Sequence, residues 1–260
     1  MKTRNYITAL MLGLLINITA SASINNIESI HLKLYKAYIS NNTALWLTGM
    51  NELELSYNKT KNPIILFELA RSQYGYIGLL IDRQEFEKAK SILPKAEKNV
   101  QDLVKQAPGS ADANALLAGI YGFKIMLYPG YVMINGPKGK NYIEKASSIK
   151  NITPSVIIEL GNYAYHTPSI LGGSIENAIS YYKKAIKLLE LKNQDKNNWQ
   201  YLNTLIWLAI SYDKNGQTEQ AISVLQIVLK KEPDLVYVKN ELYPKILKNE
   251  SIGKTYYSMK

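Results

Sequence analysis

Apolar side chains recur at three- and four-residue spacing along nearly the whole chain, which is the period of an amphipathic α-helix. The clearest stripe, near the carboxyl end, consists of Leu205, Leu208, Ala209 and Tyr212. Asn215-Gly216 marks the end of that helix, because glycine accepts the left-handed conformation that closes helices. A second helix is predicted from about residue 217, with Ala221, Leu225 and Val228 facing inward and Pro233 ending it. This segment is therefore predicted to be a helix–turn–helix unit.

Paired helices are predicted along the rest of the chain as well. The stripes lie within residues 27–38, 46–57, 111–130, 140–154, 155–165 and 174–190. A further unit begins at Leu69 with one helix and continues with a long second helix over 85–106. A capping helix starts at Leu235 and is bent or stopped by Pro244. Pro94 is expected to kink or break the long helix. About eleven helices and no sheet follow from this pattern. Two connections, residues 128–139 and 166–173, are expected to be enlarged loops.

The first residues have the pattern of a secretory signal peptide. Lys2 and Arg4 precede an apolar stretch over residues 9–16, and Ala20-Ser21-Ala22 supplies small residues for cleavage after Ala22. An uncleaved anchor is the alternative. The expected organisation is a signal peptide over 1–22, a helical hairpin over 23–62, a repeat array with its capping helix over 63–248, and a frayed tail over 249–260.

Composition limits the cellular compartments and the classes of partner that fit this chain. The chain has no cysteine, so neither a disulfide nor acylation at the signal junction is available. The expectation is a periplasmic or secreted protein without stable membrane insertion after cleavage. The net charge is +10, and loss of Lys2 and Arg4 leaves 29 basic against 21 acidic side chains, a charge of +8. Only three of the basic residues are arginines and the lysines are scattered, which favours a solvated basic surface over a nucleic-acid interface.

The helix–turn–helix unit resembles the tetratricopeptide repeat, a unit of about 34 residues. The family's small, aromatic and apolar positions and its closing proline correspond here to Ala209, Tyr212, Ala221, Leu225, Val228 and Pro233. The resemblance implies an all-α, right-handed α-solenoid with a concave inner face. Val228 departs from the usual alanine.

A second resemblance rests on the connection Pro168 to Gly173 followed by Glu176 and Ala178. It is similar to the tetratricopeptide component of TRAP-type tripartite transporters, over roughly residues 109–233. That family implies a solenoid that docks a periplasmic solute-binding protein and holds an apolar ligand. This chain departs from the family because it has no lipobox cysteine.

No pattern for catalysis, a metal or a cofactor emerges, so an enzyme is not expected. The two histidines, His31 and His166, stand outside any known metal-binding or nucleophile motif. Glu159 lies on an apolar helix without a visible partner carboxylate. Asn135 to Asn141 lacks the first glycine of a phosphate-binding loop, and we interpret it as a plain loop.

Gly172-Gly173-Ser174, directly before a helix, allows two interpretations. Free amides at a helix start favour an anion. Ser174 can also cap the helix itself, which favours a simple turn.

Two functions fit these features. The first is a scaffold that binds a protein or peptide in its concave groove, with candidate contacts Tyr74, Asn114, Tyr121, Asn162, Tyr165, His166 and Tyr212. His166 could equally cap the last turn of its helix. The second is a carrier of an apolar small molecule or lipid, with a pocket between the enlarged loops formed by Tyr128, Tyr131, Met133, Ile170 and Leu171.

Overall fold

The computed structural model of the chain describes residues 27–150 and 152–250. Across these two ranges the chain forms helices and turns and no β-strand, so the expected all-helical class is confirmed. The expected signal peptide, its cleavage after Ala22 and residues 251–260 of the expected tail lie outside the described residues.

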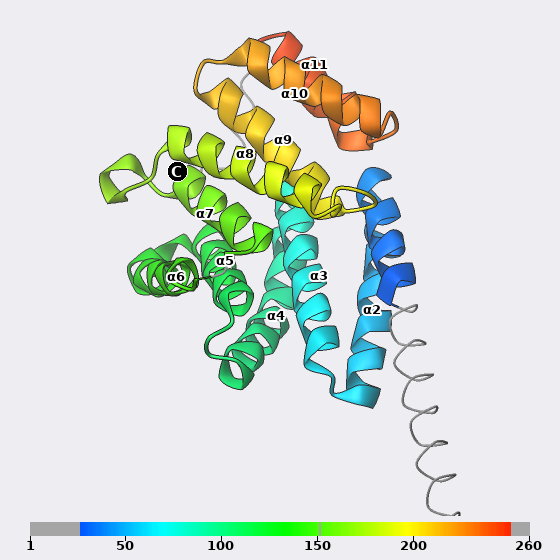
Figure 1. Cartoon of the computed structure of the whole chain (residues 1–260), viewed down its shortest axis with the longest axis vertical. Helices are drawn as coiled ribbons and strands as arrows, with labels where there is room; N and C mark the ends of the chain where they lie inside the picture. Colours follow the sequence, from blue (N-terminus) through cyan, green and yellow to red (C-terminus); the bar gives the residue numbers. More distant parts are fainter. Residues whose placement is uncertain (1–26, 151, 251–260) are drawn as a thin grey trace, which may run out of the picture.

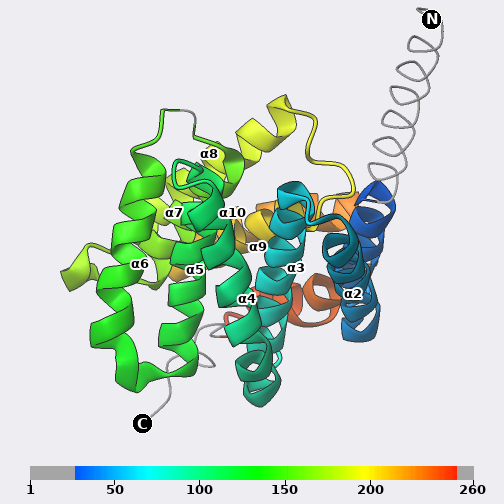
Figure 2. The same cartoon turned by 90° about the horizontal axis from the view of Figure 1, so that it is seen from below.

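The described helices form a solenoid of antiparallel pairs (Figure 1, Figure 2). Residues 27–39 are helical. The α-helices that follow are α2 (Thr43–Thr60), α3 (Pro63–Asp82), α4 (Phe86–Gln106), α5 (Ala111–Leu127), α6 (Val132–Ser147), α7 (Pro154–His166), α8 (Ile175–Leu191), α9 (Trp199–Lys214), α10 (Thr218–Lys231) and α11 (Tyr243–Leu247). Three short turns are η1 (Pro129–Tyr131), η2 (Ser169–Leu171) and the π-helical η3 (Val238–Leu242). The expected number of about eleven α-helices is confirmed for the described part of the chain.

Local chemistry explains where most helices begin. A side-chain oxygen accepts a hydrogen bond from a first-turn amide at the start of six helices, from Asn42, Asn62, Ser110, Thr153, Ser174 and Asn198. Such a cap satisfies one of the amides that a helix start leaves without a partner. Pro63 and Pro154 reinforce two of these starts, because a first helical position needs no amide hydrogen.

The pairs pack through small residues where two helices cross. α3 packs on α4, α5 on α6, α7 on α8 and α9 on α10. Alanines at the crossings are fully buried: Ala89, Ala96, Ala178, Ala185, Ala209 and Ala221. A side chain without bulk lets the two helix axes approach closely. The capping segment after α10 is buried through Leu235, Val238 and Leu242, as its stripe predicts.

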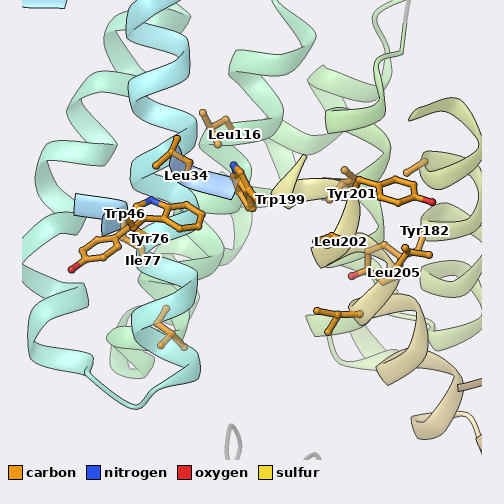
Figure 3. Close-up of a cluster of buried hydrophobic side chains, with 14 of the residues drawn as sticks. Leu34, Trp46, Tyr76, Ile77, Leu116, Tyr182, Trp199, Tyr201, Leu202 and Leu205 are labelled. Carbon is orange, nitrogen blue, oxygen red and sulfur yellow. The ribbon is translucent and has the colours of Figure 1, made fainter. Parts of the chain in front are cut away.

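The array closes on itself, because the first hairpin packs against α9. Trp46 of α2 and Trp199 of α9 meet with ring centroids 5.1 Å apart (Figure 3). Tyr38 donates a hydrogen bond of 3.1 Å to Asn203, and Tyr35 donates one to Glu232. The inner face between α3 and α9 is therefore occupied by the chain's own side chains.

The prediction of an enlarged loop over residues 128–139 is wrong. The chain turns through η1 and is helical again from Val132, and the presumed loop Asn135 to Asn141 lies inside α6. The inward stripe of α6 is Asn135, Gly139, Ile143 and Ala146, at helical spacing. A Cβ at Gly139 would lie 3.3 Å from the Cβ of Tyr121, so α6 packs closely on α5. That packing outweighs the cost of Pro137 within the helix.

Two other prolines also fail to end a helix. α4 continues through Pro94 from Phe86 to Gln106. Near the end of the array, the π-helical turn η3 leads directly into α11, and Pro244 stands in the first turn of α11, where its missing amide hydrogen costs little. The bend or stop expected at Pro244 is replaced by a change of helix type.

Candidate binding pocket and buried polar clusters

A pocket of about 420 Å³ opens where the starts of α3, α5, α7 and α9 face the end of α8. We call it the Arg71 pocket. Its lining is His31, Phe67, Glu68, Arg71, Asp112, Thr153, Pro154, Ser155, Ile158, Leu189, Lys192, Gln194, Lys196, Asn197, Asn198, Trp199 and Gln200. The α8–α9 connection, which crosses one side of this pocket, is the yellow loop at the top of Figure 2.

Arg71 is held in place from two sides. Its Nη1 donates a hydrogen bond of 2.9 Å to Gln200 Oε1, which joins α3 to α9. On the other side it forms an ion pair with Glu68, one helical turn away. His31 Nε2 lies 2.8 Å from the same Glu68 oxygen. The guanidinium therefore sits in a fixed orientation at the pocket wall.

Burial and charge act in opposite directions on Glu68. Burial alone would raise the pKa of this carboxyl, but Arg71 and His31 outweigh it, and the pKa is lowered. Glu68 is therefore a carboxylate that fixes Arg71 at the pocket wall.

The pocket lining mixes apolar and polar side chains, and its rim is basic. Phe67, Ile158, Leu189 and Trp199 supply the apolar surface. Lys192 and Lys196 are exposed at the α8 end, and Asp112 on the opposite wall is engaged by the hydroxyl of Thr153. An occupant with an apolar group and a negative charge would meet complementary surfaces.

A second polar cluster is buried between α3, α7 and α8. Glu159 accepts hydrogen bonds from the Tyr74 hydroxyl at 3.0 Å and from Asn162 Nδ2 at 3.2 Å. Tyr182 donates to Asn162 Oδ1 at 2.8 Å. Burial raises the pKa of Glu159 to about 7, although both partners favour its charged form. The cluster joins three helices through a carboxyl that titrates near neutrality.

An aromatic cluster surrounds His166. Its ring stands edge-on to Tyr165 and to Trp207 of α9, with centroids 4.9 Å and 5.1 Å away. The Lys214 ammonium lies 4.3 Å from the centre of the Tyr165 ring. Burial is the larger cause that lowers the pKa of His166 to about 4, and the positive charge of Lys214 is the smaller cause. His166 is thus a neutral packing group at the α7–α9 contact.

The predicted groove residues are distributed over separate places. Tyr74 and Asn162 belong to the Glu159 cluster, and Tyr165 and His166 to the aromatic cluster. Asn114 is fully buried and donates to the carbonyls of Pro108 and Ser110. Tyr121 is buried against Tyr142, and Tyr212 is half-buried on α9. The pocket-loop candidates Tyr128, Tyr131, Met133, Ile170 and Leu171 are exposed. The lining of the Arg71 pocket includes none of these twelve residues.

The turn interpretation of Gly172-Gly173-Ser174 agrees with the hydrogen bonds. The amides of Gly172, Gly173 and Ser174 donate to the carbonyls of Ser169, Pro168 and Ala164. Ser174 Oγ accepts from the Asn177 amide, as a capping side chain does. The amides that would bind an anion are already used inside the turn.

Neither a metal cluster nor an exposed apolar helix stands out in the described part of the chain. Across the ranges 27–150 and 152–250, His, Asp and Glu side chains form no group of three that could hold a metal ion. α3 is the one helix there whose length and composition would allow it to cross a membrane. Since 56% of its apolar window is buried in the solenoid, its place in the core accounts for this composition.

One family model and one solved structure with a TM-score above 0.5 match this architecture. The family model of the tetratricopeptide repeat matches residues 204–234, the unit formed by α9 and α10. The structure of TTC0263, a thermophilic TPR protein of Thermus thermophilus, aligns with a TM-score of 0.57 and 16% identity, covering 79% of this chain and 92% of that one. BtubC from P. vanneervenii aligns at a TM-score of 0.40 and 18% identity, over 81% of each chain. No curated protein sequence matches significantly. The chain therefore has the fold of a tetratricopeptide solenoid and contains a tetratricopeptide repeat at residues 204–234.

Proposed function

We propose that this protein is a scaffold that holds a short segment of a partner protein in the Arg71 pocket. The observation that carries the proposal is the pocket itself, which combines a fixed guanidinium, apolar side chains and two exposed lysines. Trp46 and Trp199 meet over Gly75 of α3, and the pocket, which Trp199 also lines, opens beside this contact at the starts of α3 and α9. Tetratricopeptide solenoids offer such surfaces to other proteins.

The chemistry of the lining specifies the segment. An acidic side chain or a chain-terminal carboxylate would face Arg71, Lys192 and Lys196. A neighbouring apolar side chain would enter between Phe67, Leu189 and Trp199. Because Glu68 already neutralises part of Arg71, the two lysines supply most of the attraction at a distance.

An array of short peptides, sorted by charge, tests this proposal. Acidic peptides with an apolar residue should bind the chain, and Lys192→Glu with Lys196→Glu should reduce their affinity at least roughly tenfold. The matched control is Lys183→Glu with Lys184→Glu, which reverses two exposed charges on the preceding helix, α8, outside the pocket. Equal losses in both variants would mean that overall charge, and not the pocket, decides binding.

We further propose that the scaffold works outside the cytoplasm, in a periplasm or as a secreted protein. The basic start, the apolar stretch over residues 9–16 and Ala20-Ser21-Ala22 support this proposal. Sequencing the amino terminus of the exported protein should give Ser23 as the first residue. An exported chain that still begins at Met1 would favour a retained anchor.

A small-molecule carrier is the second candidate, favoured by the pocket volume. A cavity of about 420 Å³ falls within the range of small-ligand sites. Native mass spectrometry of gently purified protein should then show a bound mass that Arg71→Met removes. A measured mass without any bound ligand, together with peptide binding, would support the scaffold function.

A further inference from the structure

Two turns of the solenoid expose large apolar side chains. The first, which we call the α6 tip, is Tyr131–Ile134, where Met133 is 83% exposed and Ile134 55%. The second, the η2 tip, is Ile170 and Leu171, which are 91% and 63% exposed. Such exposure of neighbouring large apolar side chains is costly in water unless something covers them.

Both tips lie on the same side of the array. The α6 tip follows the carboxyl end of α5, and the η2 tip follows the carboxyl end of α7. α5 and α7, each the first helix of its pair, pack against each other. In Figure 2 the η2 turn protrudes at the left, and the corner between α5 and α6 lies at the lower left. The Arg71 pocket lies beside the loop at the top of the same view. The tips can therefore meet one surface while the pocket stays open.

The sequence order of the α6 tip indicates what kind of surface fits it. A helix that docks on a rigid protein groove presents apolar residues three and four positions apart. Here four consecutive residues, Tyr131–Ile134, are exposed, and consecutive residues point to different sides of a helical turn. A deformable medium such as the edge of a lipid layer can surround such a tip, whereas a single rigid face cannot.

Charge around the α6 tip favours an anionic surface. Between Asp112 and Glu144 the chain carries three lysines and no acidic residue. Lys124 is paired with Glu97, and Lys140 Nζ lies 3.8 Å from Glu144 Oε1, while Lys138 is exposed. The Lys138 ammonium lies 5.8 Å from the Tyr121 ring centre, beside the α5–α6 contact. Tyr128 and Tyr131 add rings with a polar end, which suit the boundary between head groups and acyl chains.

We infer that the α6 tip and the η2 tip dock this protein on an anionic lipid surface. Met133 and Ile170 enter the acyl boundary, and Lys138 and Lys140 contact the head groups. The protein then lies on the membrane without crossing it. This surface is separate from the Arg71 pocket, so the inference goes beyond the proposed scaffold function.

Site-specific fluorescence tests the inference, because the chain has no cysteine and a single introduced thiol can be labelled alone. An environment-sensitive dye is attached after Met133→Cys or Ile170→Cys. Vesicles of phosphatidylethanolamine with phosphatidylglycerol should shift both emissions to the blue. The control is Leu191→Cys, since Leu191 is 70% exposed at the opposite end of α8 and should show no shift. The readout is local, so residues 1–26 cannot produce it.

Binding strength provides the second measurement. Lys138→Gln with Lys140→Gln should weaken vesicle binding roughly tenfold, and added salt should weaken the unchanged chain similarly. Equal shifts with phosphatidylcholine vesicles alone, or an equal shift at Leu191→Cys, would overturn the inference. A concentration-dependent blue shift at Met133→Cys without vesicles would replace it with a protein partner, a second copy of this chain.

Discussion

The indole rings of Trp46 and Trp199 meet edge to face over Gly75, with their centroids 5.1 Å apart and an interplanar angle of 67° (Figure 3). The contact joins the first hairpin to α9, and Trp46 also donates a hydrogen bond of 3.0 Å to the Ser72 carbonyl. Repeat arrays normally hold together through neighbouring units alone. Here a contact between distant parts of the sequence ties the beginning of the described array to its later repeats.

Gly75→Ala should destabilise the fold. An added Cβ would lie 2.7 Å from atoms of both Trp46 and Trp199, so the two indoles would have to separate. Overpacking of this kind costs about 1–3 kcal/mol. Urea unfolding followed by tryptophan fluorescence measures the loss.

Gly78→Ala on the same helix is the matched control. There an added Cβ meets Phe123 at 3.5 Å, an ordinary contact. Since alanine is the better helix former, this change should be neutral or should stabilise by up to about 1 kcal/mol. A Gly75→Ala variant as stable as Gly78→Ala would show that the two indoles do not confine the backbone.

The Glu159 cluster should make stability depend on pH. The pKa of Glu159 is about 7 in the fold against an ordinary value of 4.5, so the fold favours the protonated form. Its contribution is therefore lost as pH rises from about 4.5 through 7, by roughly 3 kcal/mol at most. The measurement is the difference in unfolding free energy between Glu159→Gln and the unchanged chain, which should grow in favour of the variant across this window.

An exposed carboxyl supplies the control for that measurement. Glu144 lies on the outer side of α6, with its side chain 65% exposed. Glu144→Gln should leave the shape of the pH curve as it is in the unchanged chain. A flat difference for Glu159→Gln as well would show that the buried carboxyl has the same proton affinity in the folded and unfolded chain.

His166 should make stability depend on pH in the direction opposite to that of Glu159. Its pKa is about 4 in the fold against an ordinary 6.5, so the unfolded chain takes up the proton more readily. Its contribution to stability is present above pH 6.5 and lost as pH falls toward 4. NMR titration suits this test, because the chain has two histidines and His166→Gln identifies the signal. A His166 resonance that titrates near pH 6.5 would contradict the burial argument.

Much of the fold could be predicted because its signals are local. The stripes of α9 and α10 contain strong apolar residues at helical spacing, and Asn42, Ser174 and Gly216 mark helix ends by their own chemistry. The first half of α6, residues 132–139, escaped prediction because its inward positions are Asn135 and Gly139, which a hydrophobic pattern does not register. Their burial is a consequence of packing against α5 and is not visible in the segment alone.

The Arg71 pocket could not be assembled from sequence because its parts come from distant elements. Arg71 and Gln200 belong to α3 and α9, and His31 comes from the first described helix. One local signal was present. Glu68 and Arg71 stand three residues apart on a long and strongly apolar helix, where an ion pair has little reason to occur without a role. Four groove candidates lie instead in the Glu159 cluster and the aromatic cluster: Tyr74, Asn162, Tyr165 and His166.

The two glycines before α8, Gly172 and Gly173, should differ in how much stability the fold loses when each is replaced by alanine. A Cβ at Gly173 would lie 1.7 Å from the Thr167 carbonyl oxygen, which no small shift relieves. Gly172 meets nothing nearby but has φ of +96°, where alanine is strained. Gly173→Ala should therefore lower the unfolding free energy by more than about 2 kcal/mol, and Gly172→Ala by about 1 kcal/mol. Removing the cap by Ser174→Ala should also cost about 1 kcal/mol. Urea unfolding of the three variants ranks them, and a Gly173→Ala variant as stable as Gly172→Ala would mean that the turn can open without disturbing the α7–α8 pair.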